Sequence, residues 1–90
     1  MMDLRKRLEL LGERFKGRIN GVWYESMLMY LQQNEPAQFL VELCEVLCDG
    51  EGKITKEEYT DIYSLNAEMG FPVGEKTMKY LLQEKCDEAR

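Results

Sequence analysis

The stretch LCDGEGKITKEEY, residues 47–59, decides how the chain folds. Its glycines and polar side chains indicate a turn. Thr55 is followed three residues later by Glu58, and such a pair forms a capping box, in which each side chain accepts a hydrogen bond from the other residue's backbone N–H. A helix is therefore expected to begin at Thr55. Before the turn, a helix starting near Pro36 is indicated by apolar residues at helical spacing, namely Phe39, Leu40, Leu43, Val46 and Leu47.

The same helical spacing extends over most of the 90-residue chain. Asn20 is expected to cap the second helix, and Gly12 to end the first. No segment shows a convincing strand pattern, so the predicted class is all-α. Residues 1–70 are expected to form one unit of four helices, and residues 71–90 a fifth helix that packs on this unit or extends it. The spacing predicts helices over residues 3–11, 20–33, 36–47, 55–69 and 75–84.

An internal repeat relates the two halves of the four-helix unit. A shift of 35 residues aligns Gly17, Ile19 and Tyr24 with Gly52, Ile54 and Tyr59. The matched positions are those that a helix–loop–helix unit would bury, so the sequence predicts two such units in tandem. The apolar residues around both loops align as well: Leu4, Leu8 and Leu11 with Phe39, Leu43 and Val46, and Met27 and Leu28 with Ile62 and Tyr63.

These residues resemble the EF-hand family, in which two helix–loop–helix units pair into one lobe, as in calmodulin or a myosin light chain. The family's 12-residue loop carries oxygen ligands at positions 1, 3, 5, 7, 9 and 12 and glycine at position 6. The resemblance places the two loops at residues 12–23 and 47–58. It also implies that Ile19 and Ile54, both at position 8, pair with each other through a short β-bridge.

Both loops depart from the calcium-binding pattern of the family. In the first loop Arg14 and Lys16 occupy ligand positions, and Trp23 replaces the closing glutamate. Calcium requires six to eight oxygen ligands, so this loop is expected to bind none. In the second loop Leu47 replaces the first ligand. We therefore expect no cofactor, with weak calcium binding as the alternative through the remaining ligand positions, Asp49, Glu51, Lys53 (carbonyl), Thr55 and Glu58.

Charge and composition restrict the expected partners. The net charge is −5, with +3 over residues 1–18 and −8 over the remainder. An acidic body without a basic stripe is a poor ligand for nucleic acid and suits a basic helical partner. No apolar run is long enough to span a membrane, and the first residues lack the apolar region of a signal peptide, so we expect a cytoplasmic protein without membrane insertion. The cysteines, expected to be reduced, are Cys44, Cys48 and Cys86.

Catalysis is not expected from this sequence. The chain contains no histidine, which removes the usual general base and zinc ligand. No glycine-rich phosphate loop occurs, and no pair of carboxylates lies in an apolar context that would tune its acidity. The sequence therefore favours a binding protein over an enzyme.

The resemblance implies a module whose hydrophobic groove grips an amphipathic, basic helix of a partner protein. We expect this module to work without calcium, in a light-chain or adaptor role. It is expected to act as a monomer bound to its target or as a dimer formed through the fifth helix. If the fifth helix does not form a dimer, it is expected to fill the groove or to extend it. The alternatives are a weak or partner-assisted calcium sensor, a small acidic inhibitor acting by occlusion, and a piece of a longer EF-hand protein. The expected groove residues are Leu8, Trp23, Met27, Leu28, Leu31, Phe39, Leu43, Ile62, Tyr63 and Met69.

Overall fold

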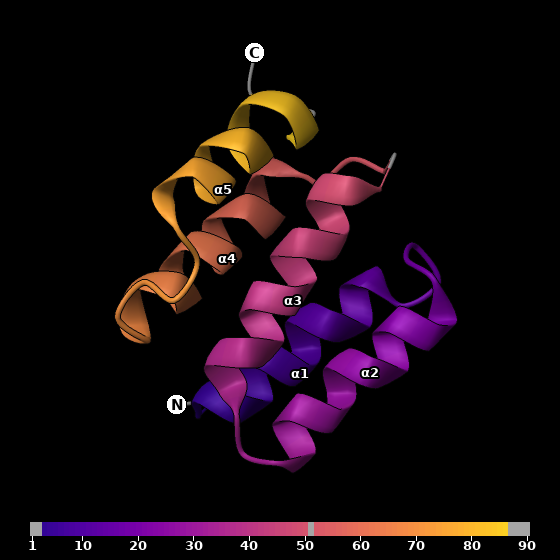
Figure 1. The fold of residues 1–90 in the computed structure, drawn as a ribbon. Coiled ribbons are helices and arrows are strands. Elements are labelled where there is room, and N and C mark those ends of the chain that lie inside the picture. Colours follow the sequence, from indigo (N-terminus) through magenta and orange to yellow (C-terminus); the bar gives the residue numbers. More distant parts are fainter. Residues whose placement is uncertain (1–2, 51, 87–90) are drawn as a thin grey trace.

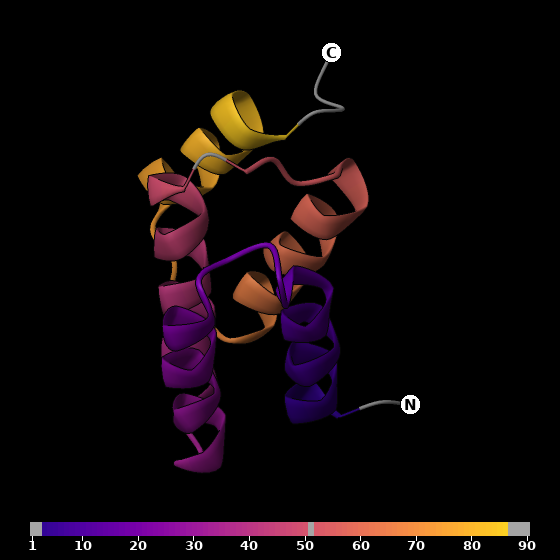
Figure 2. The ribbon, with the colours of Figure 1, turned by 90° about the vertical axis from the view of Figure 1, so that its right-hand side faces the viewer.

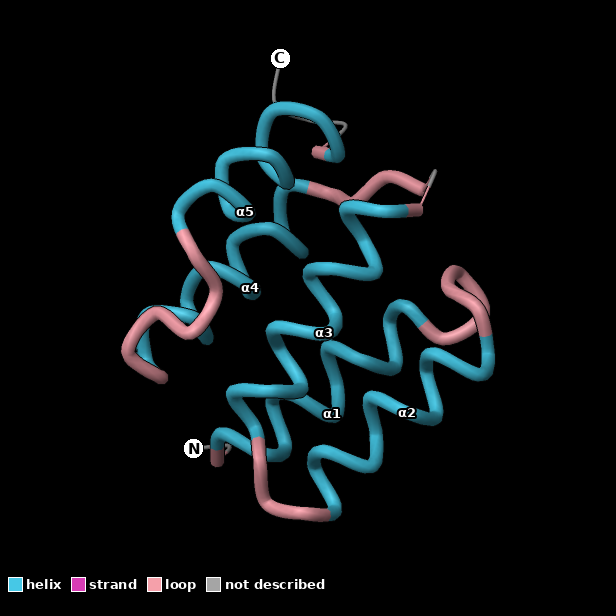
Figure 3. Tube along the Cα trace, in the orientation of Figure 1, coloured by secondary structure: helices cyan, strands magenta, loops and turns pink. Residues whose placement is uncertain are grey.

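The computed structural model of the chain describes residues 3–50 and 52–86. No strand occurs among these residues, so the all-α class is confirmed (Figures 1 and 3). No helix in this part of the chain combines the length and the apolar character needed to cross a membrane. The elements are α1 (Leu4–Phe15), α2 (Gly21–Gln32), α3 (Pro36–Asp49), α4 (Lys56–Glu68) and α5 (Glu75–Tyr80), which continues into one π-helical turn, η1 (Leu81–Lys85).

Local capping explains where three of the helices begin. The Asp3 side chain accepts a hydrogen bond from the backbone N–H of Lys6, 2.8 Å away, and so caps α1. Asn20 caps α2 in the same way by accepting from Val22, as the sequence predicts. The capping box of Thr55 and Glu58 is present at the start of α4, with both of its reciprocal hydrogen bonds. Each of these side chains satisfies a backbone donor that the first helical turn leaves unpaired.

The prediction that Gly12 ends the first helix is wrong. α1 continues through Gly12 to Phe15. A Cβ atom at position 12 would lie 3.0 Å from the Cζ atom of Phe39, which is closer than a normal carbon contact. Glycine therefore serves here to let the aromatic ring of α3 pack directly against the backbone of α1, and its cost in helix propensity is offset by that contact.

The helices lie in two layers, which Figure 2 shows from the side. One layer contains α1 and α4, and the other contains α2, α3 and α5. α3 is central, because it contacts every other helix. The buried apolar core draws on all five helices and on the segments around α4: Leu8, Leu11, Phe15, Met27, Leu31, Phe39, Leu40, Leu43, Cys44, Leu47, Ile54, Ile62, Leu65, Val73, Met78, Leu81 and Cys86.

The fifth helix packs into this core. Met78 and Leu81 are buried, and the π-helical turn that follows α5 lies against α3. Burial of a side chain of this size contributes about 1.5–3 kcal/mol, so these two residues hold α5 firmly on the rest of the molecule.

Candidate functional site

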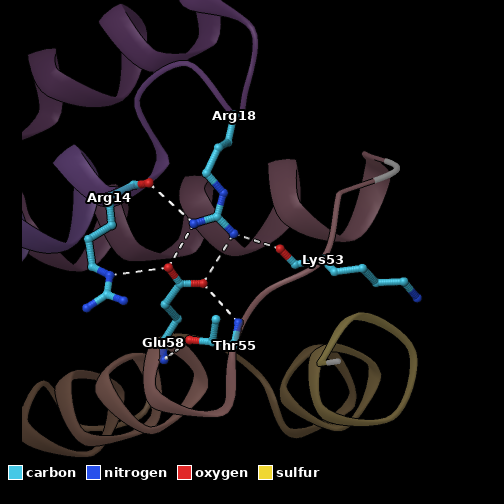
Figure 4. Close-up of polar contacts among 5 residues, drawn as sticks. All are labelled: Arg14, Arg18, Lys53, Thr55 and Glu58. Atoms are coloured by element: carbon cyan, nitrogen blue, oxygen red, sulfur yellow. Dashed lines mark hydrogen bonds and ion pairs between the residues drawn. The ribbon is translucent and has the colours of Figure 1, made fainter. Parts of the chain in front are cut away.

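The first part of the candidate site is a charged cluster that joins the two interhelical loops (Figure 4). Arg18 lies in the loop between α1 and α2, and its guanidinium reaches the carboxylate of Glu58 on α4 at 2.8 and 3.2 Å. The same guanidinium donates to the backbone carbonyl of Lys53 at 2.7 Å and to that of Arg14 at 3.3 Å. Arg14 adds a contact of 3.2 Å from its own Nε to the Glu58 carboxylate. One side chain therefore connects both loops and the start of α4.

Glu58 is the buried partner in this cluster, with 2% of its surface exposed. Burial by itself would raise the pKa of its carboxyl group. Hydrogen bonds from Arg18 and from the backbone of Thr55, together with the charge of Arg18 and a hydrogen bond from Arg14, outweigh burial and hold the pKa of Glu58 below its ordinary value. The carboxylate is therefore ionised and paired at neutral pH.

The same contacts engage most of the second loop's expected calcium ligands. The carbonyl of Lys53 and the carboxylate of Glu58 both accept from Arg18. The hydroxyl of Thr55 accepts the backbone N–H of Glu58, 3.0 Å away. Asp49 is exposed at the end of α3, and Glu51 lies outside the described residues. Across the part of the chain that is described, no three His, Cys, Asp or Glu side chains meet in a way that could hold a metal ion.

The β-bridge expected between Ile19 and Ile54 is not the one the structure contains. Ile54 forms a parallel bridge with Cys86 instead, and its backbone N–H donates to the carbonyl of Lys85 at 2.8 Å. Ile19 is partly buried and packs against the core. The physical reason is that Arg18 already joins the loops through a side chain, while the turn after α5 supplies a backbone acceptor for Ile54. Sequence reasoning missed this partner because Cys86 lies 32 residues further along the chain.

The residues expected to line an open groove lie mostly inside the core. Leu28 and Met69 are partly buried against it, while Trp23 and Tyr63 are about half exposed, on different helices. The prediction that these residues form one continuous groove is therefore wrong for this arrangement of helices. Most of the same side chains fill the interior between the helices instead. The buried members are Leu8, Met27, Leu31, Phe39, Leu43 and Ile62.

An apolar pocket of about 290 Å³ opens beside Trp23, next to the charged cluster. We call it the Trp23 pocket. The indole side chain is 48% exposed. A cavity of about 150 Å³ is enough to hold benzene, so this pocket has room for one large apolar side chain of a binding partner. Its main lining residues are Phe15, Ile19, Trp23, Val46, Leu47 and Lys53, together with the loop glycines 50 and 52, Asp49 and Arg18.

An acidic stripe on α3 leads to this pocket. Glu42, Val46 and Asp49 follow one another at the helical spacing of four and three residues and so share one face, with Glu45 beside them. Val46 and Asp49 also line the pocket. Residues 19–52 contain six carboxylates and no lysine or arginine. Arg18 and Lys53 also line the pocket itself, so the charge that favours a cationic partner belongs to the adjoining face of α3 and not to the pocket.

A second hollow, of about 450 Å³, lies between α4 and α5. Phe71 stands at its rim with 60% of its surface exposed and with a φ of 62°, in the left-handed region that few residues other than glycine adopt. The turn is fixed from inside by Asn66, which is 1% exposed and exchanges two hydrogen bonds with the backbone of Val73, at 2.8 and 3.1 Å. The sequence GFPVG, residues 70–74, is typical of a turn, whereas Asn66 carries no signal of its own.

The three cysteines are free thiols, as expected. Burial raises the pKa of Cys44 to about 12, with smaller contributions from Cys48 and Glu45. Burial also raises the pKa of Cys48. Neither thiol is therefore activated as a nucleophile.

Comparison with known proteins gives no match: no family model, no curated protein and no solved structure is significantly similar to this chain. The EF-hand resemblance therefore rests on the loop and repeat residues themselves and stays a prediction.

Proposed function

We propose that this chain is a calcium-independent protein-binding module, of the light-chain or adaptor type, that grips an amphipathic, basic helix of a partner protein. The observation that carries this proposal is the Trp23 pocket, an open apolar site at the end of the acidic stripe of α3. Helix-in-groove recognition needs such an apolar anchor point together with complementary charge along the helix.

The spacing of the site suits a helical ligand. Glu42 and Asp49 lie seven residues apart on α3, which corresponds to about 10 Å along the helix axis. A partner helix that inserts one apolar side chain into the Trp23 pocket can place lysine or arginine residues one and two turns away, facing these carboxylates. Rim charges of this kind mainly raise the association rate and the specificity, while the buried anchor sets the dissociation rate.

The Arg18 cluster supports the calcium-independent part of the proposal. In a calcium-binding loop the metal ion draws the backbone carbonyl and the closing carboxylate together. Here a guanidinium contacts both the carbonyl of Lys53 and the carboxylate of Glu58. Since an arginine is always charged and always present, this contact holds the loop next to the pocket at every calcium concentration.

Fluorescence of Trp23, the single tryptophan, can test the proposal directly. The probe is a synthetic amphipathic helix built from leucine and lysine, compared with a helix of the same pattern in which glutamate replaces lysine. We expect the lysine helix to give a saturable blue shift of the Trp23 emission, both in buffer with calcium and in buffer with a chelator. We also expect it to bind at least 10-fold more tightly than the glutamate helix. Equal affinity for the two helices, or no binding of either, would refute the proposal.

Variants separate the contributions of pocket and stripe. Replacement of two of the three carboxylates in and beside the stripe, Glu42→Lys and Glu45→Lys, should weaken the lysine helix by about 10-fold or more, which corresponds to about 1.4 kcal/mol. The matched control is Glu13→Lys, an exposed glutamate on α1 that lies outside the pocket and the stripe. It should leave the affinity within about 2-fold.

The same titration distinguishes the two alternatives. A weak or partner-assisted calcium sensor would bind the lysine helix more tightly in calcium than in chelator. An inhibitor that acts by occlusion would use the same face, so its distinguishing test is whether the complex blocks the partner's own activity. The Trp23 pocket favours helix binding over a calcium sensor, because its apolar wall includes Phe15, Ile19 and Val46, none of which is an expected calcium ligand.

A further inference from the structure

The loop between α3 and α4 has two roles in the structure. It supplies Gly50, Gly52 and Lys53 to the wall of the Trp23 pocket. The same loop is held by the last described residues of the chain, Glu84, Lys85 and Cys86, which we call the C-terminal clasp. The pocket wall and the clasp are therefore joined by one short segment.

Three hydrogen bonds form the clasp. The backbone N–H of Ile54 donates to the carbonyl of Lys85 at 2.8 Å, as part of the parallel β-bridge between Ile54 and Cys86. The Lys53 ammonium donates to the carbonyl of Glu84 at 2.8 Å. In the opposite direction, the Lys85 ammonium donates to the carbonyl of Gly50. Gly50 and Gly52 carry no side chain, so these contacts hold the loop together with the hydrogen bond from Arg18 to the carbonyl of Lys53.

The clasp is held more weakly than the helix that carries it. α5 is anchored by the buried side chains of Met78 and Leu81. In the clasp, both lysine contacts lie at exposed positions, and Cys86 is the only buried side chain among its three residues. Glu84 and Lys85 belong to the π-helical turn η1, a form that is rare and occurs mostly as single turns. Local opening is therefore easiest between η1 and the loop, while α5 stays docked.

We infer that the C-terminal clasp is a releasable strap that sets the shape of the Trp23 pocket. When it is closed, Gly50 and Lys53 are held in the wall of the pocket, and when it opens, this wall moves away from Trp23. The inference deepens the proposed function, since it names a regulation of the same site, but the opening itself is defined without any partner. A ligand that binds the closed pocket would stabilise the clasp, and release of the clasp would weaken binding by the same factor.

Hydrogen exchange of the Ile54 amide measures the opening, because this N–H is the donor to Lys85. In the unmodified protein we expect this amide to exchange at least 10-fold faster than the amide of Leu43 in the centre of α3. Lys85→Met, which removes the contact to Gly50 and changes a residue that is not itself part of the pocket lining, should accelerate exchange at Ile54 by a further 3-fold or more. Exchange at Leu43 should not change.

NMR chemical shifts supply the link to the pocket. Lys85→Met should shift the Trp23 indole N–H and the amides of Gly50 and Gly52, whereas the control Lys79→Met, an exposed lysine of α5 that lines the hollow between α4 and α5, should not. The inference is overturned if Ile54 exchanges only as slowly as Leu43, or if the Trp23 resonance is unaffected by Lys85→Met. Failure of the lysine helix to bind would refute the proposed function and leave these two measurements standing.

Discussion

Arg18 is the residue through which the two loops meet. Besides the backbone carbonyl of Arg14, its guanidinium donates to three acceptors, which are the two carboxylate oxygens of Glu58 and the carbonyl of Lys53. The guanidinium also lies over the ring of Phe15, 4.6 Å from the ring centre. A planar group with five donors suits such a set better than an ammonium group does. Because Glu58 is buried, removal of its main partner leaves a charged group that water does not reach.

We expect Arg18→Met to lower the free energy of unfolding by about 1–3 kcal/mol. The range lies below the 3–5 kcal/mol typical of a broken buried ion pair, because Arg18 itself is partly exposed and Arg14 still contacts Glu58. Arg18→Lys should lose less, since it keeps the charge but not the paired geometry. Urea denaturation measures the effect. The control is Arg5→Met, whose pair with Glu9 is exposed and should contribute no more than about 0.5 kcal/mol. Equal losses at Arg18 and Arg5 would contradict the role of the cluster.

The lowered pKa of Glu58 predicts how stability depends on pH. A carboxyl group whose pKa is lower in the folded than in the unfolded protein stabilises the fold fully above the unfolded value, and this contribution is lost as the pH falls through the folded value. The ordinary value is 4.5, so the loss begins near that pH and continues below it. Glu58→Gln should be less stable at neutral pH and should show a flatter stability curve in the acid range. Glu13→Gln is the control, and a curve for Glu58→Gln parallel to that of the unmodified protein would contradict the prediction.

At the scale of elements, the turn between α4 and α5 contains a strained residue whose side chain contributes little to packing. Phe71 adopts a left-handed conformation, which costs a residue with a side chain about 1–2 kcal/mol, and its ring remains mostly in solvent. Asn66 fixes the turn through buried hydrogen bonds to Val73. The arrangement displays an aromatic ring at the rim of the hollow between the two helices.

Replacement of Phe71 by glycine tests this view. Glycine relieves the left-handed strain, while the loss of a mostly exposed ring and the larger entropy of the unfolded chain act in the other direction. We therefore expect the free energy of unfolding to change by no more than about 1 kcal/mol, in contrast to the roughly 3–5 kcal/mol that Phe39→Ala should cost in the core. Thermal and urea unfolding measure both variants. A loss at position 71 close to that at position 39 would show that Phe71 is a packing residue after all.

The elements differ in how far the sequence predicts them. The capping box at Thr55 and the cap at Asn20 are local interactions within three residues, and both are present as predicted. Gly12 was read as a helix end because its partner, Phe39, lies on another helix and leaves no local signal. The pairing of Ile54 with Cys86 was missed for the same reason.

The candidate site was predicted less well than the helices, and the cause is physical. Glu58 was read as a metal ligand because a carboxylate at that position suits a cation, and the structure supplies the cation as Arg18, 40 residues away. Eight of the ten apolar residues expected in the groove are fully or partly buried. Periodicity alone does not say whether a groove or a closed core buries them. Trp23 and Tyr63 remain at the surface, and Trp23 marks the pocket.

At the scale of the whole molecule, two distant parts of the chain contact the loop between α3 and α4. Arg18, from the loop between α1 and α2, reaches the carbonyl of Lys53, and the carbonyl of Lys85, near the C-terminal end, receives the N–H of Ile54. Lys53 and Ile54, adjacent residues of one loop, therefore contact the loop between α1 and α2 and the C-terminal end of the described chain. A disturbance at either contact is expected to reach the Trp23 pocket, which shares this loop.

The whole-molecule consequence is that stability should not respond to calcium. A ligand that binds only the folded protein stabilises it by RT ln(1 + [L]/Kd), so a site with a Kd of about 10 μM would add about 2.7 kcal/mol at about 1 mM calcium. For a domain of this size such a gain raises the Tm by roughly 10–20 °C. If Arg18 keeps its hold on Glu58 and Lys53, any residual site has a Kd above about 10 mM, and the gain falls below about 0.1 kcal/mol, too small to move the Tm measurably. Thermal unfolding in calcium, in magnesium and in chelator compares these cases. Arg18→Met in the same buffers shows whether removal of the guanidinium frees the oxygens for calcium. A rise in the Tm of the unmodified protein by several degrees, with calcium but not with magnesium, would contradict the prediction. It would show that calcium displaces Arg18, and that the Arg18 cluster does not take the place of the metal ion.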